Sequence, residues 1–349
     1  MNSEELMLRA ITQAEKFKYT AKPNPVVGAI LHNGEEIISE GYHEKYGDNH
    51  AEINAISSAQ KYYGDKFKSF NDLTLICTLE PCSHIGKTGS CAKRIVDVGI
   101  KNVVIGSIDP NPKVSGKGID ILRENNINVT VGIHEKLVED QNKYFFYKHQ
   151  NNKPYITLKI ASSLDGKSHL NSNERVFVTS ESSRKDVQLI RASQDAILTG
   201  GNTLRNDNPI MNARVDFKVN QPKKILLTKK DYPKDLDFFN KDFLEVYKSR
   251  DLKKILNSLS STDICSILVE AGPKLATSFL EARYVDEVIV YTSSKALGKN
   301  GISWFREDNA IENYGFKLES TYEIDDDIKQ IYKKDCLLYT SPSPRDNKA

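Results

Sequence analysis

Strand-like and helix-like segments alternate along most of the chain. In the first half, apolar runs at 73–79, 102–108 and 128–131 predict strands, and helical spacing at 92–98 and 117–125 predicts the helices between them. The remaining predicted elements are strands at 26–31, 36–38, 155–161, 195–199, 224–228, 266–270 and 287–291, and helices at 4–18, 51–63, 134–150, 180–192, 252–259 and 274–282. Strands that alternate with helices predict an α/β fold with much parallel pairing.

The length of the chain favours two domains. It has 349 residues, and a typical domain has about 100–200. The polar, turn-prone Asn151–Pro154 follows the last helical pattern of the first half. We therefore place the domains at 1–148 and 149–335. The Ser/Pro-rich residues 336–349 resemble an in-frame translation of a sequencing adapter, so they are left out of the fold and the natural C-terminus is expected to be missing. A genuine disordered tail is the alternative.

Charge and composition exclude several classes of protein. Lys+Arg is 49 and Asp+Glu is 47, so the net charge of +2 gives no argument for a nucleic-acid or acidic-membrane partner. No apolar run approaches the roughly 20 residues of a membrane-spanning helix. The N-terminus is polar, which argues against a secretory signal, and five cysteines favour a reducing compartment. We expect a cytoplasmic protein.

A metal-binding pattern occupies the first half. His50 and Glu52 open a predicted helix, Cys82 follows Pro81, and Cys91 comes nine residues later. One imidazole and two thiolates suit a catalytic Zn²⁺, which keeps its fourth position for water. Glu52 could then carry a proton, as the equivalent glutamate does in zinc nucleobase deaminases, although eight residues separate the cysteines here instead of two.

Two simpler interpretations compete with a catalytic zinc. Cys82 and Cys91 could be buried core thiols beside a surface His50. A structural zinc is the other possibility, but it usually has four protein ligands, and Cys77 lies too deep in a strand pattern to be an obvious fourth.

The segment Thr78–Cys91, TLEPCSHIGKTGSC, resembles the inter-cysteine loop of the bifunctional deaminase/reductase family of riboflavin biosynthesis. Other motifs of that family follow in the same order over residues 3–335: Pro23–Gly28, Gly41–His43, Asp109–Pro112, Leu158–Gly166, Asp195–Thr203, Asp207–Pro209 and Glu270–Pro273. The resemblance implies a cytidine-deaminase-like three-layer α/β/α domain followed by a dihydrofolate-reductase-like α/β domain.

For the first domain, the resemblance implies hydrolytic deamination of 2,5-diamino-6-(5-phosphoribosylamino)pyrimidin-4(3H)-one. The implied metal ligands are His50, Cys82 and Cys91, with one Zn²⁺ per chain, and Glu52 is the implied proton carrier. The implied substrate-binding residues are Asn24 for the pyrimidine and His84, Lys87, Asp109 and Asn111 for the ribose phosphate.

For the second domain, the resemblance implies NADPH-dependent reduction of the ribosyl group to ribityl, giving 5-amino-6-(5-phosphoribitylamino)uracil. No Rossmann G-x-G-x-x-G follows a strand, so the residues alone do not predict a nicotinamide. The implied NADPH-binding residues are Ala161, Phe177, Thr203, Asp207, Thr228, Gly272, Pro273, Lys274, Leu275, Ala276, Thr277 and Ser278. The implied substrate-binding residues are Lys159, Arg175, Arg191, Met211, Arg214 and Glu270. Phe177 replaces a tryptophan of the family, and Arg175 stands where a serine is common.

Three alternatives remain open at this point. The second domain could be a degenerate scaffold beside a working deaminase. A nucleic-acid-editing deaminase would instead show a basic, aromatic-rich strip and closely spaced cysteines. A zinc-stabilised interaction protein would need a fourth protein ligand. We expect a small-molecule pyrimidine ribosyl phosphate as substrate, neither nucleic acid nor membrane as partner, and a homo-oligomer.

Overall fold

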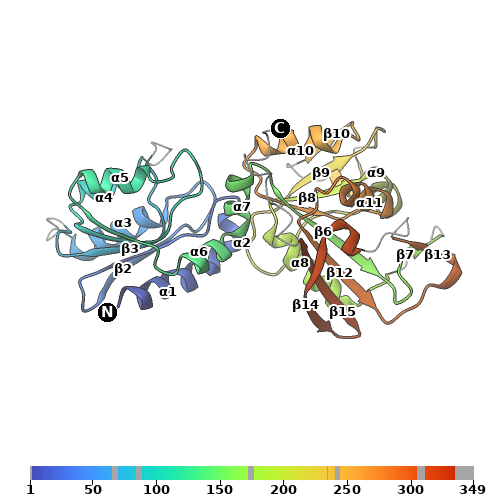
Figure 1. Cartoon of the computed structure of the whole chain (residues 1–349), viewed down its shortest axis with the longest axis horizontal. Coiled ribbons are helices and arrows are strands. Elements are labelled where there is room, and N and C mark those ends of the chain that lie inside the picture. The colour runs from blue at the N-terminus through green and yellow to red at the C-terminus, as the bar shows by residue number, and fades with distance from the viewer. Residues whose placement is uncertain are drawn as a thin grey trace, which may run out of the picture. The chain divides into compact units, whose positions relative to one another are not determined.

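The structure is a computed structural model, and it describes residues 2–64, 70–83, 89–171, 177–233, 235–239, 244–304 and 311–334. The chain divides into two compact units, each treated below by itself (Figure 1). The first holds the residues up to Pro154 together with Asp216–Asn220, and the second holds Tyr155–Val215 and the residues from Gln221 onward.

The first unit is built on a five-stranded sheet in the order β2-β1-β3-β4-β5. β1 pairs antiparallel with β2 and β3, whereas β3, β4 and β5 run parallel. The strands are β1 Gly28–His32, β2 Ile37–Tyr42, β3 Thr74–Leu79, β4 Asn102–Ser107 and β5 Asn128–Val131. The helices are α1 Ser3–Ala14, α2 Lys18–Ala21, α3 Ala51–Tyr63, α4 Cys91–Asp97, α5 Lys117–Glu124, α6 Glu135–Gln141 and α7 Lys143–Asn151, with a 3₁₀ turn at Glu15–Phe17.

Helices cover both faces of this sheet, which gives three layers (Figure 1). On one face, Ile56 of α3, Ile95 of α4 and Leu122 of α5 pack over the strands. On the other face, Leu6 and Met7 of α1 pack the same way. Each fully buried aliphatic side chain of this kind contributes about 1.5–3 kcal/mol. The expected three-layer α/β/α architecture is confirmed.

Two features of the first unit place its site. A Cβ on Gly41 of β2 would lie 2.2 Å from the backbone of Ala51 and Ala55, so only glycine lets α3 pack this closely. The parallel strands β3 and β4 end side by side, with Leu79 opposite Ser107. The residues that follow these two strands therefore emerge at the same edge of the sheet.

The second unit is built on an eight-stranded sheet in the order β10-β9-β8-β11-β6-β12-β15-β14. The strands from β10 to β12 in this order are parallel, and β15 and β14 continue antiparallel. The strands are β6 Tyr155–Ser162, β8 Ala196–Gly200, β9 Lys223–Leu227, β10 Leu244–Tyr247, β11 Ser266–Val269, β12 Glu287–Ser293, β14 Phe316–Ile324 and β15 Asp327–Lys334, with a separate pair β7 Lys167–Leu170 and β13 Gly301–Ser303. The helices are α8 Glu181–Ser193, α9 Gly201–Asp207, α10 Leu252–Ser260 and α11 Pro273–Glu281, with 3₁₀ turns at Asp237–Phe239, Gly298–Asn300 and Ile311–Tyr314.

The helices of the second unit also lie on both faces of its sheet (Figure 1). Leu256 of α10 and Phe279 of α11 pack on one face. Val187 of α8 and Leu204 of α9 belong to clusters on the other. The parallel α/β arrangement expected for the second half is confirmed.

The predicted helix over 134–150 is wrong in one respect, because it is two helices that break at Asn142. The Asn142 side chain is buried and bonds the backbone of Val26 through both amide atoms, at 2.6 and 3.1 Å. Helix α6 therefore ends where the Asn142 side chain is held by Val26, which is 116 residues away. Local sequence spacing cannot predict such a contact.

Among the described residues, none of the helices is both long enough and apolar enough to cross a membrane.

Candidate functional site

Three predicted metal ligands meet in the first unit. His50 is the residue just before α3, Cys91 is the first residue of α4, and Cys82 follows the end of β3. His50 Nδ1 lies 3.6 Å from Cys82 Sγ and 3.3 Å from Cys91 Sγ. The ligand atoms all lie within 4.8 Å of one another. We call these three residues the metal set.

The metal set fits a zinc ion. With Zn–S near 2.3 Å and Zn–N near 2.0 Å, a tetrahedral site separates its nitrogen and sulfur ligands by about 3.5 Å. The backbone N–H of Cys91, at the start of α4, lies 3.4 Å from Cys82 Sγ. A helix start favours a negative sulfur, so the chemistry of the donors also suits the ion.

The thiols and the imidazole change one another's pKa. The hydrogen bond with Cys91, and to a lesser extent the one with His50, lowers the pKa of Cys82 to about 4. The hydrogen bond with Cys82 raises the pKa of His50 to about 9. The hydrogen bond with Cys82, together with burial, raises the pKa of Cys91. The Cys82 thiolate therefore forms readily here. Zinc binding requires the Cys91 thiol to lose its proton as well, because zinc binds thiolates.

Glu52 lies beside the metal set. It is the second residue of α3, 3% exposed, and burial raises the pKa of its carboxyl. Its charge interacts with those of His50 and Cys82. A buried carboxyl with a raised pKa, held next to a metal-binding position, suits transfer of a proton near neutral pH.

Asn24 is connected to the metal set through His43, a residue to which sequence reasoning gave no role. Asn24 Nδ2 lies 3.1 Å from His43 Nε2, and His43 Nδ1 lies 3.0 Å from the carbonyl of Asn49. The His43 and His50 rings meet edge to face with centroids 5.7 Å apart. The Gly41–His43 motif was the only sequence signal for this link.

Asp109 and Asn111 follow β4 at the same sheet edge as Cys82. Asp109 is 8% exposed, and burial raises the pKa of its carboxyl to about 7. Its charge interacts with those of Cys82 and His50. Asp109 Oδ1 accepts the Asn111 N–H at 2.8 Å, which turns the chain back at this point. The predicted ribose-phosphate residues His84 and Lys87 lie outside the described residues.

Three predicted substrate residues of the second unit form one charge cluster, in which Arg191 and Glu270 are buried and Lys159 is partly buried. Glu270 accepts from Arg191 Nε at 2.6 Å and Nη2 at 2.9 Å, and Lys159 Nζ lies 3.2 Å away. Burial acts to raise the pKa of Glu270, but Arg191 and Lys159 together lower it to about 2. The cluster forms because β11 and β6 are parallel neighbours, with Val269 opposite Leu158.

Met211 and Arg214 lie beside this cluster. Arg191 Nη2 is 3.9 Å from Met211 Sδ, and Nη1 donates to the carbonyl of Asn212 at 3.2 Å. Arg214 Nη1 lies 3.4 Å from Asn212 Oδ1. The described substrate residues predicted for the second unit are therefore close together, while Arg175 lies outside the described residues.

Several of the predicted NADPH residues meet at the carboxyl ends of β8 and β9. A Cβ on Gly200 would lie 3.1 Å from Leu275 of α11, and one on Gly201 would lie 2.8 Å from Thr228 Oγ1. α11 starts at Pro273 without a side-chain cap on Gly272, and nothing lies within 4 Å of a Cβ built on Gly272. Uncapped N–H groups at an open helix start suit a phosphate, so these residues fit a phosphorylated cofactor such as NADPH.

The other predicted NADPH residues are more scattered. The Ala276 and Thr277 side chains are buried, while Phe177 is half exposed under the Arg184 guanidinium, 4.4 Å from its ring centroid. The remaining ones are Ala161 on β6, opposite Tyr291, Thr203 and Asp207 on α9, and Lys274 and Ser278 on α11.

Two family models match the chain, one in each half. Residues 1–107 match the cytidine and deoxycytidylate deaminase zinc-binding region, and residues 154–330 match the RibD C-terminal domain. RibD of Buchnera aphidicola is 35% identical over 94% of this chain and 97% of its own length. RibD of Escherichia coli is 34% identical over 86% of this chain and 90% of its own.

The chain belongs to the RibD family.

Solved RibD structures have the same fold. Acinetobacter baumannii RibD is 33% identical with a TM-score of 0.86, and covers 95% of this chain and 98% of its own. A Thermotoga maritima protein, described as a diaminohydroxyphosphoribosylaminopyrimidine deaminase/5-amino-6-(5-phosphoribosylamino)uracil reductase, is 32% identical with a TM-score of 0.83, and covers 95% of this chain and 99% of its own. The predicted cytidine-deaminase-like and dihydrofolate-reductase-like folds are confirmed.

As a RibD, the chain is a bifunctional enzyme of riboflavin biosynthesis, with a zinc-dependent deaminase and an NADPH-dependent reductase. The three alternatives left open by the sequence are not favoured. The expected small-molecule substrate also fits this family.

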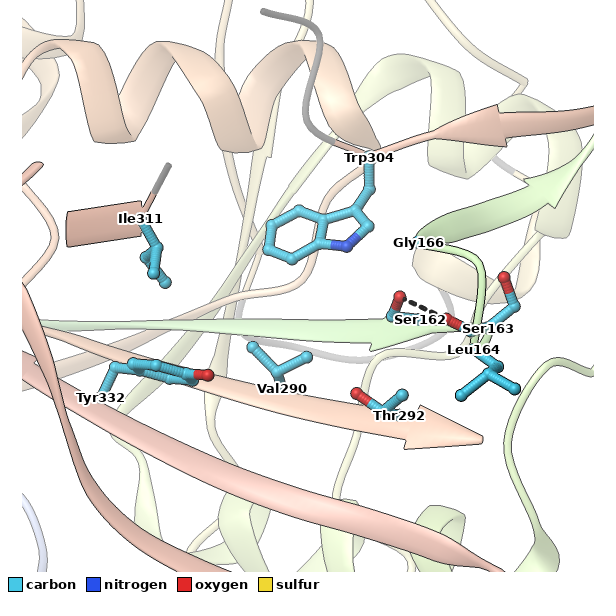
Figure 2. Close-up of a pocket in the computed structure, with 9 residues that line it drawn as sticks. All are labelled: Ser162, Ser163, Leu164, Gly166, Val290, Thr292, Trp304, Ile311 and Tyr332. Atoms are coloured by element: carbon cyan, nitrogen blue, oxygen red, sulfur yellow. Dashed lines mark hydrogen bonds between the residues drawn. The ribbon is translucent and has the colours of Figure 1, made fainter. Parts of the chain in front are cut away.

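A pocket of about 220 Å³ opens elsewhere in the second unit of this RibD (Figure 2). Ser162, Val290 and Thr292 lie along its floor, and Trp304 stands over it. Successive residues of a strand point to opposite faces, so Ser162 and Lys159 lie on opposite sides of β6. Of the predicted substrate and cofactor residues that the structure describes, none lines this pocket.

Proposed function

We propose that the first unit deaminates 2,5-diamino-6-(5-phosphoribosylamino)pyrimidin-4(3H)-one, and that the second reduces the product to 5-amino-6-(5-phosphoribitylamino)uracil. The arrangement of His50, Cys82 and Cys91 around one point, with Glu52 beside it, carries the proposal. The Thermotoga relative is described by both of these activities.

In the deaminase, His50, Cys82 and Cys91 would hold the zinc ion. Zinc supplies Lewis acidity, which makes water a stronger nucleophile at neutral pH. Glu52 takes a proton from the attacking water and passes it to the leaving nitrogen, so that C2–NH₂ and water become C2=O and ammonia. The raised pKa of Glu52 suits both accepting and returning the proton.

Other residues of the first unit would bind the substrate. Asn24, oriented by His43, holds the pyrimidine. Asp109 and Asn111 hold the ribose phosphate together with His84 and Lys87. The lysine and histidine of the inter-cysteine loop supply the positive charge that a phosphate needs.

In the reductase, the uncapped start of α11 and the Gly200–Gly201 turn would bind the cofactor phosphates. NADPH supplies a hydride to C1′ of the ribosyl group. The substrate would bind next to the charge cluster of Lys159, Arg191 and Glu270. Met211 and Arg214 lie beside this cluster.

The proposal extends to the organisation of the protein. We assign deamination to residues 1–148 and reduction to 149–335, and we expect a cytoplasmic homo-oligomer that binds neither nucleic acid nor membrane. The oligomer rests on the family resemblance, and light scattering of the purified enzyme measures it.

The full chain, purified with zinc, tests the proposal. It is given the diaminopyrimidinone ribosylamino phosphate with and without NADPH, and the products are followed by mass spectrometry. We expect loss of ammonia without NADPH and a further two-hydrogen gain only with it. Deamination without reduction would overturn the second half of the proposal, and an unchanged substrate would overturn the first.

A further inference from the structure

Glu80 lies between the end of β3 and Cys82, yet it neither belongs to the metal set nor was assigned a role from the sequence. Its carboxyl is 3% exposed. Among the described residues, no lysine, arginine or histidine forms an ion pair with it. A buried carboxyl of this kind needs hydrogen-bond donors, and here the backbone supplies them.

Four backbone N–H groups donate to Glu80. Oε2 accepts from Asp109 at 3.2 Å and Gly116 at 3.0 Å, and Oε1 accepts from Gly118 at 2.9 Å and Ile119 at 3.3 Å. Four bonds use the full acceptor capacity of a carboxylate. None of the four donors is nearer than 29 residues along the chain.

The four donors define what Glu80 holds. Asp109 and Gly116 are the two ends of one loop, and a single oxygen bonds both of them. Gly118 and Ile119 belong to the first turn of α5, which follows that loop. Glu80 thus closes the base of the loop 109–116 and attaches it to the strand end that leads to Cys82.

The approach is too close for any other residue at position 118. A Cβ on Gly118 would lie 1.9 Å from the Pro81 carbonyl and 3.1 Å from Glu80 Oε1. Gly116 has φ +79°, a conformation that glycine adopts without strain. Both glycines are therefore placed where the loop must meet the Glu80–Pro81 segment.

We infer that Glu80 is a positioning residue for the substrate, because it fixes the loop that carries Asp109 and Asn111 at a set place beside the metal set. This inference rests on the proposed function of that loop in binding the ribose phosphate. Backbone N–H groups already use the acceptor positions of the Glu80 carboxylate, so its loss should weaken substrate binding more than it slows the chemical step.

The test is Glu80→Gln in the full chain. The amide keeps one acceptor oxygen but presents an NH₂ to the other pair of N–H donors, so either both ends of the loop or the start of α5 lose their bonds to residue 80. Glu124→Gln is the matched control, because Glu124 is an exposed residue at the end of the same helix. Zinc content, deaminase KM and kcat, and hydrogen exchange of residues 109–119 are measured on all three proteins.

We expect Glu80→Gln to bind one zinc, to raise KM at least tenfold with kcat within about threefold, and to speed exchange in residues 109–119. Glu124→Gln should match the wild type. A second background, Asn111→Ala, separates positioning from general damage: if Glu80 acts through the loop, Glu80→Gln should raise KM less than twofold there.

An unchanged KM in folded, zinc-loaded Glu80→Gln overturns the inference, as does an equal rise in KM in the Asn111→Ala background. If Glu80→Gln does not fold, Glu80→Asp, which keeps the carboxylate but shortens its reach, is judged by the same criteria. If the wild type does not deaminate the substrate, that result overturns only the proposed function. Hydrogen exchange of residues 109–119 still decides whether Glu80 holds the loop.

Discussion

Arg191 and Glu270 form a two-pronged ion pair inside the second unit, with guanidinium nitrogens 2.6 and 2.9 Å from two different carboxylate oxygens. Both side chains are at most 10% exposed. Taking two charges out of water costs free energy, which their close, two-pronged contact must offset. The pair lies among the proposed substrate residues of the reductase.

Arg191→Met should therefore remove reductase activity and destabilise the second unit. Removing one partner of a buried pair costs about 3–5 kcal/mol, because the other charge stays buried with less compensation. Urea unfolding followed by the fluorescence of Trp304, the single tryptophan of the chain, measures the loss in the second unit. Arg250→Met, at an exposed position, is the control, and equal stabilities of the two variants would contradict the prediction.

Glu270 should also make the stability of the second unit depend on pH. Its pKa is lowered from the usual 4.5 to about 2, so its stabilising effect is present above pH 4.5 and is lost as the pH falls to about 2. Between pH 4.5 and about 2, the free energy of unfolding should fall less steeply with decreasing pH in Glu270→Gln than in the wild type. The difference in slope should correspond to at most one proton taken up on unfolding. Parallel pH profiles would show that Glu270 does not titrate in this way.

Elements that are determined by the local spacing of apolar residues could be predicted from the sequence, whereas elements that depend on pairing with distant segments could not. Local spacing predicted α3 and β5 with the bounds that the structure has, since α3 buries one regular apolar face and the alternating Val129 and Val131 of β5 pack, partly buried, against the same core. The β14–β15 hairpin was not predicted, because most of its side chains are polar and at least partly exposed. Its place in the sheet comes from pairing with β12.

The same distinction holds for the site. The metal set could be predicted because zinc restricts its ligands to a few residue types at recognisable positions. His43 and Glu80 could not, because their roles depend on bonds to distant residues: His43 bonds Asn24, 19 residues away, and Glu80 accepts four backbone N–H groups that are at least 29 residues away. A glutamate in a strand-end motif looks the same whether it binds a ligand or four backbone amides.

Glu52→Gln should abolish deamination without releasing the metal. The amide has nearly the shape of the carboxyl but cannot take a proton from water, and positioned proton transfer contributes roughly 10²–10⁴-fold to a rate. Metal analysis should still find one zinc per chain, and NADPH-dependent reduction of the already deaminated substrate should be unchanged. Deaminase turnover near the wild-type rate would remove Glu52 from the mechanism.

Replacing a metal ligand should separate the two activities. Cys82→Ala leaves one imidazole and one thiol, so zinc should be lost and deamination with it, whereas the reductase should keep its rate. Cys77→Ala is the matched control: Cys77 is also a buried thiol of the first unit, but it lies within β3 and is not part of the metal set. It should keep one zinc per chain and full deamination. If Cys77→Ala lost zinc as Cys82→Ala does, the loss would reflect damage to the core around β3, and the assignment of Cys82 as a ligand would have to be given up.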